Sequence, residues 1–262
     1  MRALSPLLLA AVTRALAVRR IAVKMSAQGL AQGVLLTKAG KDGVSLGDCP
    51  FAQYAAMSME LAGATYSVRP TAPAQKPAWH VDAHGGSMPC WAPNGADDGA
   101  GAIADSGAIA QGFLPPSPAD TAVLEICGGL FGGIARYVKN ADAAKDGELL
   151  EGLTEQLDKL QNCLGLCEQL RGDGAGPYLS GAAPGLADAF VAPKLYVLFV
   201  AGGHFKGFTL SERHPKVASY WAAISAHEAF CKTRYPEAEM LHGWAEARGE
   251  VESEGPGCAI EW

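Results

Sequence analysis

The sequence lacks the patterns that would tie it to nucleic acid or to a structural metal. Among 262 residues with a net charge of −6, no run is dense in lysine and arginine, and no repeat mixes basic with aromatic residues. Nucleic-acid binding therefore has little support. No CxxC is present, and Cys163 and Cys167, one helical turn apart, have no pair of zinc-ligand spacing near them. We expect neither a nucleic-acid partner nor a metal site.

Disulfides and membrane spans have little support either. The seven cysteines are an odd number without paired spacing, which favours a reduced intracellular compartment. The apolar run from Leu7 to Val12 is too short to cross a bilayer, and residues 186–203 are interrupted by Asp188, Pro193 and Lys194. We expect no stable membrane insertion.

The first thirty residues contain no acidic side chain, and the first aspartate is Asp42. The basic residues in this stretch are Arg2, Arg14, Arg19, Arg20 and Lys24. An acid-free, arginine-containing, amphipathic start is typical of an organelle transit peptide. We interpret residues 1–30 as such a presequence, with the chloroplast favoured over the mitochondrion. A disordered extension without a targeting role is the alternative, and translation from Met25 would give a cytosolic form.

Residues 31–114 alternate between strand and helix patterns. In order, the patterns predict a strand in GVLLTKAG (33–40), a helix in PFAQYAAMSMELAG (50–63), a strand in TYSVRP (65–70), an extended piece in SMPCWAP (87–93) and a helix in DSGAIAQGFL (105–114). The first helix begins at Pro50 and ends before Gly63, as helices with proline at the first position and glycine after the last often do. This region is therefore predicted to be a small α/β domain.

The pattern becomes helical after the proline-rich segment 114–118. GELLEGLTEQLDKLQNCLGLCEQL (147–170) carries one apolar stripe, 186–203 is nearly all apolar, and HPKVASYWAAISAHEAFCKTR (214–234) is amphipathic. We therefore predict an all-helical domain over 119–249, followed by a tail at 250–262. The fold class is α/β plus all-α.

The stretch GDCPFAQY (47–54) places Cys49 at the start of the first predicted helix, with Pro50 at its first position. Unpaired N–H groups and the helix dipole favour negative charge there, so we expect a lowered thiol pKa and a reactive thiolate. Asp48 opposes that charge, which suggests that it contacts a substrate or accepts a proton. The alternative is a buried, inert thiol. Because no second cysteine follows in the motif, an external thiol such as glutathione would have to regenerate Cys49.

Several longer motifs carry a family resemblance over residues 34–248. They are LGDCPFAQ, QKPAW, GPYLSG, APKLYVLFVAGGHFKGF and FCKTR. Together they resemble the plant-type dehydroascorbate reductases of the glutathione transferase superfamily. The resemblance implies a thioredoxin-like N-terminal domain followed by a helical glutathione transferase C-terminal domain. It also implies regeneration of ascorbate from dehydroascorbate, with glutathione as co-substrate and without metal, flavin or nicotinamide. We expect a monomer.

The resemblance also implies the site residues. Cys49 would be the catalytic nucleophile, with Lys38, Asp48 and His204 holding dehydroascorbate or ascorbate. The residues expected to bind glutathione are Lys76, Met88, Asp105, Ser106 and Trp244. A cis-proline at position 89 would leave the Met88 backbone able to pair with the peptide-like ligand, and the helix start at 105–107 could bind its γ-glutamyl carboxylate.

Each of these assignments has a structural alternative. Lys76 could be a solvated surface lysine, Asp105 with Ser106 only a helix cap, His204 a surface histidine, and Trp244 a packed anchor for the tail.

Three departures from the family pattern stand out. Gly185 occupies a position where a Ser or Thr helix cap is expected, and Gly lacks the capping oxygen. Ala247 replaces an expected basic residue, and a substitute role for the adjacent Arg248 is doubtful. The segment 94–104 is longer than a tight hairpin needs.

The resemblance implies ping-pong chemistry in which Cys49 is oxidised to a sulfenic acid by dehydroascorbate. One glutathione would form a mixed disulfide with Cys49, and a second would release oxidised glutathione. A rival enzyme is an omega-like thiol transferase that removes glutathione from mixed disulfides. A rival non-enzyme is a redox-regulated, membrane-inserting protein like the intracellular channels, which the charged residues between 34 and 60 disfavour.

Overall fold

The computed structural model describes residues 32–95, 98–171 and 176–251. The predicted presequence 1–30, with the possible start at Met25, lies outside the described residues. So does the tail from residue 252 onward.

The α/β part is built on a mixed sheet whose described strands have the order β2–β1–β3. The central strand β1 (Gly33–Lys38) runs parallel to β2 (Ser67–Thr71) and antiparallel to β3 (Cys90–Pro93). Leu35 pairs with Val68 on one side and with Trp91 on the other. All three strands lie where the sequence predicts strands or extended pieces.

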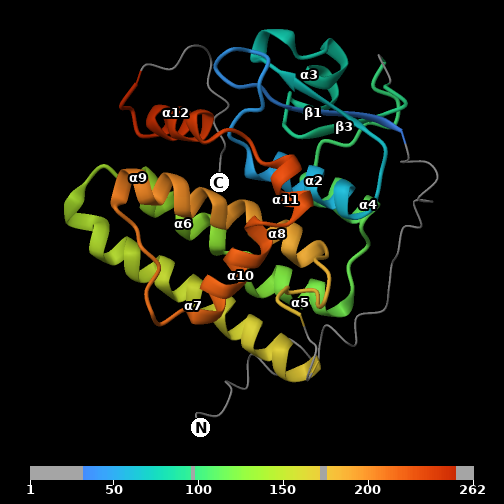
Figure 1. Ribbon diagram of the computed structural model, residues 1–262. Coiled ribbons are helices and arrows are strands. Elements are labelled where there is room, and N and C mark those ends of the chain that lie inside the picture. Colours follow the sequence, from blue (N-terminus) through green and yellow to red (C-terminus); the bar gives the residue numbers. More distant parts are fainter. Residues whose placement is uncertain (1–31, 96–97, 172–175, 252–262) are drawn as a thin grey trace.

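Helices cover both faces of this sheet, as Figure 1 shows: α2 (Pro50–Leu61) and α4 (Ser106–Phe113) face the helical part, and α3 (Ala78–His84) lies on the opposite side. The 3-10 turn η2 (Pro73–Gln75) leads into α3, which the sequence analysis did not predict. The layering is that of a thioredoxin-like domain.

Helix α2 packs against both the α/β part and the helical part of the molecule. Its Ala55 and Met59 pack with the sheet core around Trp91, whereas Tyr54 and Met57 belong to the larger core of the helical part. A helix that is apolar on two faces is buried on both. The N-terminus of α2, where Cys49 lies, therefore stands at the junction of the two parts.

The second part of the chain is helical, as predicted. Its elements are α5 (Pro118–Ile126), α6 (Leu130–Lys139), η3 (Ala143–Lys145), α7 (Asp146–Arg171), α8 (Leu186–Val197), the π-helical turn η4 (Leu198–Gly202), α9 (Gly203–Lys206), α10 (Pro215–Ser225), α11 (Glu228–Thr233) and α12 (Glu237–Ala247). The prediction of one helix over 214–234 was wrong at His227, whose backbone is extended and whose Nδ1 accepts the Ala229 N–H at 3.2 Å. The helical stretch is therefore divided: α10 ends at Ser225, and His227 caps the start of α11.

The start of α8 shows how the chain accommodates Gly185. The Gly185 N–H donates to the buried carboxylate of Asp188 at 2.9 Å. A Cβ at position 185 would lie 2.5 Å from Ser180 Oγ, so a larger cap residue would require Ser180 to shift. The missing capping oxygen comes instead from Asp120 of α5, which accepts the Ala187 N–H at 3.1 Å. A residue distant in sequence therefore caps the helix.

Two helical stretches are long and apolar enough to cross a membrane by length and composition alone. They are Pro118–Lys139 and Leu186–Lys206. In the most apolar part of each stretch, 56% of the first and 78% of the second is buried inside the protein. Burial on several sides is the usual state of core helices in a helical domain.

Candidate active site

Cys49 lies where strand, loop and helix meet. The chain leaves β1 at Lys38, turns back so that the Gly47 N–H donates to the Lys38 carbonyl at 2.9 Å, and enters α2 at Pro50. A Cβ on Gly47 would lie 2.5 Å from the Ala39 carbonyl oxygen, so glycine permits this close return. Cys49 is the N-cap of α2, and its Sγ accepts the Ala52 N–H at 3.4 Å. The predicted strand–turn–helix setting is confirmed.

The electrostatic environment of Cys49 differs from the expectation. Burial raises the pKa of the thiol to about 11, since only 6% of the residue is exposed. The Ala52 N–H and Lys38 lower the pKa, and the Asp48 charge raises it. The expected lowering was wrong in this conformation because desolvation outweighs the helix N-terminus. With a pKa of about 11, the thiol keeps its proton at neutral pH in this conformation.

Lys38 and Asp48 form an ion pair beside Cys49, with 2.5 Å between Lys38 Nζ and Asp48 Oδ1. Burial acts to lower the pKa of Lys38, but the charge and hydrogen bond of Asp48 raise it overall. Burial raises the pKa of Asp48, and Lys38 offsets only part of that rise. Desolvation therefore decides the direction of the pKa shift of Asp48. The Asp48 side chain is 11% exposed, whereas that of Lys38 is 41% exposed.

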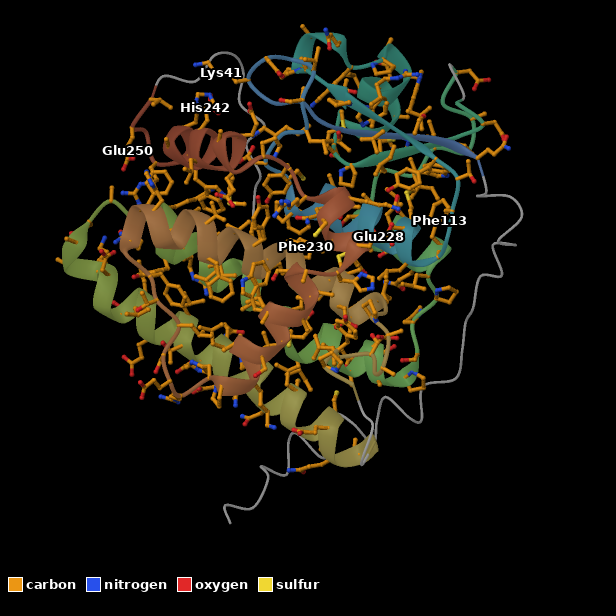
Figure 2. The ribbon with its side chains drawn as sticks, viewed as in Figure 1. Lys41, Phe113, Glu228, Phe230, His242 and Glu250 are labelled. Atoms are coloured by element: carbon orange, nitrogen blue, oxygen red, sulfur yellow. The ribbon has the colours of Figure 1, made fainter. Side chains whose placement is uncertain are left out.

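Helix α12 covers this ion pair. A Cβ on Gly243 would collide with the Asp48 carboxylate, so the α12 backbone lies directly on it. Glu239 accepts the Lys41 N–H at 2.7 Å, which fixes the β1–α2 loop to α12. Figure 2 shows Lys41 and His242 where this loop meets the helix. The side of Asp48 that faces α12 is closed in this conformation.

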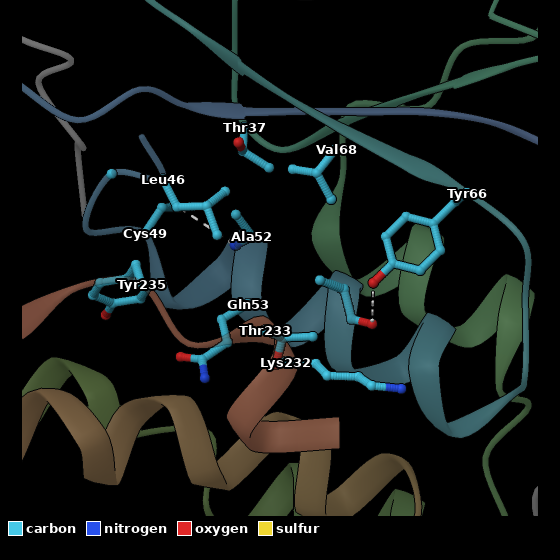
Figure 3. Close-up of a pocket in the computed structure, with 12 residues that line it drawn as sticks. Thr37, Leu46, Cys49, Ala52, Gln53, Tyr66, Val68, Lys232, Thr233 and Tyr235 are labelled. Carbon is cyan, nitrogen blue, oxygen red and sulfur yellow. Dashed lines mark hydrogen bonds between the residues drawn. The ribbon is translucent and has the colours of Figure 1, made fainter. Parts of the chain in front are cut away.

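A small pocket of about 40 Å³ adjoins Cys49, and Figure 3 shows the side chains around it. Tyr235 lies below Cys49, and the wall is completed by residues of β1, β2, α2 and α11. A volume of this size accommodates about two or three water molecules and is far smaller than a typical ligand pocket. Tyr235 and Gln53 were not predicted from the sequence, because only the fold brings residue 235 next to α2.

The predicted glutathione residues before β3 lie together. The Met88–Pro89 peptide is cis, as expected. Lys76 extends from the end of η2, and its Nζ donates to the Gly86 carbonyl at 2.7 Å. His80 of α3 bonds the Ser87 carbonyl at 2.8 Å. His80 was not predicted as a site residue, because it lies on α3, a helix that the sequence pattern does not indicate.

Asp105 and Ser106 begin α4. The Asp105 carboxylate accepts the Ala108 N–H at 2.6 Å, so it is the N-cap of the helix. The alternative of a capping role is therefore confirmed for Asp105. Capping does not test its predicted contact with glutathione, because the side chain is exposed and has a second oxygen.

Two further predicted site residues lie on the helical part: Trp244 is buried and His204 is exposed. Trp244 of α12 is 5% exposed and meets the Phe131 ring edge-on at 6.4 Å, as a packed anchor would. His204 is exposed on α9 and meets the Phe205 ring at 4.7 Å. Figure 1 shows α9 below α12, and no hydrogen bond that the structure shows for the described residues joins His204 to Cys49.

Arg248 serves the packing of the C-terminal helix. Its guanidinium donates to the carbonyls of Val138 and Asn140, at 2.5 and 3.0 Å, and lies over the Phe205 ring. These contacts tie the end of α12 to the end of α6. They give Arg248 a structural role, in line with the doubt about its substitution for a basic residue at Ala247.

No group of three or more histidine, cysteine or acidic residues among the described residues is arranged to hold a metal ion. Cys163 is buried on α7, and Cys167, one turn later, is partly exposed.

Comparison with known proteins places these features in a family. Residues 143–223 match the model of the glutathione S-transferase C-terminal domain. A rice protein named probable glutathione S-transferase DHAR1, cytosolic, is 30% identical over 207 residues, covering 77% of this chain and 91% of the rice protein. The Arabidopsis protein glutathione S-transferase DHAR3, chloroplastic, is 26% identical, covering 76% of this chain and 74% of its own.

A solved structure agrees with the sequence relatives. The crystal structure of dehydroascorbate reductase from Chlamydomonas reinhardtii superposes with a TM-score of 0.68 at 26% identity, covering 82% of this chain and 98% of that chain. The rice relative and the solved structure each cover more than three quarters of this chain. The chain belongs to the plant-type dehydroascorbate reductase family of the glutathione S-transferase superfamily.

Proposed function

We propose that the protein is a glutathione-dependent dehydroascorbate reductase whose nucleophile is Cys49. The observation that carries the proposal is the position of Cys49 at the N-cap of α2, beside the Lys38–Asp48 ion pair, in a chain of this family. A helix N-terminus can stabilise a thiolate once water or a substrate reaches it. With one cysteine in the motif, the oxidised sulfur requires an external thiol for its reduction.

The proposed catalytic cycle has three steps. The Cys49 thiol, dehydroascorbate and one water give ascorbate and a Cys49 sulfenic acid, with two electrons leaving the sulfur. Glutathione then attacks this sulfur, and water leaves as the mixed disulfide forms. A second glutathione thiolate attacks the glutathione sulfur of that disulfide, which releases oxidised glutathione and restores the Cys49 thiol. Products leave between half-reactions, so ping-pong kinetics are expected.

Lys38 and Asp48 have complementary roles in this proposal. The Lys38 ammonium attracts the carbonyl and enolate oxygens of the substrate, and it stabilises the negative charge that develops as dehydroascorbate is reduced. The Asp48 carboxylate, next to the thiol, is placed to accept a proton or a substrate hydroxyl. Because α12 lies on Asp48 in this conformation, substrate entry on this side requires α12 or the loop to move.

Glutathione would bind along the segment before β3. In the proposed arrangement, its backbone pairs with Met88, Lys76 attracts a carboxylate, and the N–H groups at the start of α4, with Asp105 and Ser106, receive the γ-glutamyl end. The capping bond of Asp105 supports a fixed helix start at this point. Trp244, which is 5% exposed on α12, stays a predicted glutathione contact in this proposal, and His204, exposed on α9, stays a predicted substrate contact.

The experiment that tests the proposal compares two substrates. Turnover is measured with dehydroascorbate and with a glutathionylated peptide disulfide, at the same glutathione concentration. A higher kcat/KM with dehydroascorbate supports the reductase. A much higher value with the peptide disulfide would replace it by the omega-like thiol transferase.

We also propose plastid import through residues 1–30. The composition of this segment and the chloroplastic name of the Arabidopsis relative support it. The rice relative is named cytosolic, which fits a form that starts at Met25. Fusing residues 1–30 to a fluorescent protein tests the idea, and a diffuse cytosolic signal would contradict it.

A further inference from the structure

The segment that joins α3 to β3 is tied back onto the elements before it. Its Gly86 carbonyl accepts from Lys76 Nζ at 2.7 Å, and its Ser87 carbonyl is bonded to His80 Nε2 at 2.8 Å. The Gly86 and Ser87 N–H groups donate to the carbonyls of His80 and His84, both at 3.2 Å. The backbone that leads into Met88 is therefore held from several directions.

The hydrogen bond from His80 to the Ser87 carbonyl is made by a buried side chain. The residue is 0% exposed, and its Nδ1 is buried without a hydrogen-bond partner among the described residues. Burial lowers the pKa of His80 below its ordinary value. A carbonyl oxygen only accepts, so Nε2 of the neutral ring carries the hydrogen and donates it to Ser87. The tautomer is fixed by this single bond.

The bonded carbonyl belongs to a peptide unit whose other edge carries the Met88 N–H. A trans peptide is planar, so its C=O and N–H point to opposite sides and turn together. Holding the Ser87 carbonyl from the side of α3 therefore sets the direction of the Met88 N–H on the far side. A hydrogen bond to the carbonyl also polarises the unit and strengthens the N–H as a donor.

We propose that His80 is a positioning residue of the glutathione site, which orients the Met88 N–H toward the ligand by holding the Ser87 carbonyl. The inference rests on the proposed binding of glutathione at Met88. His80 touches no reacting atom in this arrangement. It acts through one peptide plane, so it governs glutathione affinity and leaves the Cys49 chemistry unchanged.

The test compares three variants by calorimetric titration with glutathione. His80→Phe keeps an aromatic ring but lacks the donor, and His80→Gln keeps a side-chain N–H. His84→Gln removes the neighbouring imidazole of α3 and leaves the backbone bond between the Ser87 N–H and the carbonyl of residue 84 in place. We expect the dissociation constant to rise about three- to tenfold in His80→Phe, the size of one lost hydrogen bond. His80→Gln and His84→Gln should stay within about twofold of the parent protein.

Kinetics and thiol alkylation separate glutathione binding from the chemistry of Cys49. In His80→Phe, the KM for glutathione should rise with kcat nearly constant, and iodoacetamide should alkylate Cys49 at the parent rate. If the parent protein binds glutathione and His80→Phe binds it equally well, the inference is wrong. An equal loss in His84→Gln would also overturn it. If the parent protein binds no glutathione, the proposed function fails, and this inference fails with it.

A measurement on the unmodified protein covers the case in which His80→Phe does not fold. Saturating glutathione should shift the NMR signals of the Met88 amide and the His80 Nε2–H together, because the two bonds share one peptide unit. A Met88 shift without any change at His80 would contradict the proposed coupling.

Discussion

Two glycines in the middle of helices should respond in opposite ways to the same substitution. Gly152 lies in α7, and a Cβ there would meet no atom within 4 Å. Gly243 lies in α12, and its Cβ would collide with the Asp48 carboxylate. Alanine favours the helix over glycine at both positions, by about 0.8–1 kcal/mol each. The difference between the variants therefore isolates the contact between α12 and Asp48.

The contact at Gly243 should outweigh the gain in helix propensity. Overpacking in a close-packed site costs about 1–3 kcal/mol. A displaced Asp48 also loses the 2.5 Å bond to Lys38 while it stays largely buried, at a cost of about 1–3 kcal/mol. We expect Gly243→Ala to be destabilised by about 1–5 kcal/mol after the propensity gain, and Gly152→Ala to be stabilised by about 1 kcal/mol. In a chain of this size the first change lowers Tm by several degrees.

Urea unfolding followed by circular dichroism measures both variants, and the dehydroascorbate assay is run in parallel. Gly243→Ala should also lose turnover, because Asp48 is displaced beside the nucleophile. Gly152→Ala should keep the parent rate. If Gly243→Ala were stabilised as much as Gly152→Ala and kept full activity, the close packing of α12 on Asp48 would be refuted.

Three further substitutions test the electrostatics of buried groups. Asp48→Asn removes a charge that raises the pKa of Cys49, so iodoacetamide should alkylate Cys49 several-fold faster while dehydroascorbate turnover falls; slower alkylation would contradict this. Burial lowers the pKa of Lys194 well below its ordinary value, so below about pH 10 the unfolded chain binds this proton more tightly than the folded chain, and stability falls as pH drops. Lys194→Met should therefore be more stable at pH 7 by about 1–3 kcal/mol, with a flatter stability profile between pH 8 and 10, and an unchanged profile in urea titrations would count against it. Asp120→Ala removes the cap at Ala187, and its unfolding free energy should fall by about 2–4 kcal/mol, more than one surface cap contributes; a loss below 0.5 kcal/mol would exclude the capping role.

The sequence was sufficient for features that depend on local chemistry. Pro50 and Gly63 mark the ends of α2, and the motif around Cys49 predicts its place at the helix start. The cis peptide before Pro89 follows from the family resemblance. These features depend on neighbours along the chain or on motifs that can be read directly.

Features set by burial and by distant contacts could not be predicted. The pKa of Cys49 depends on how completely the loop and α12 exclude water, and that is a property of tertiary packing. His80 became visible only when α3 placed it against the carbonyl of Ser87. Asp120 caps α8 from 67 positions away, so no local pattern indicates it.

The most direct test of the central claim is the glutathione-dependent reduction of dehydroascorbate, followed as ascorbate absorbance, in the parent protein and two variants. Cys49→Ser removes the proposed nucleophile, and Cys231→Ser removes an exposed thiol on α11 as the matched control. We predict turnover in the parent protein and in Cys231→Ser, and none above background in folded Cys49→Ser. Substantial turnover in Cys49→Ser would show that Cys49 is not the nucleophile.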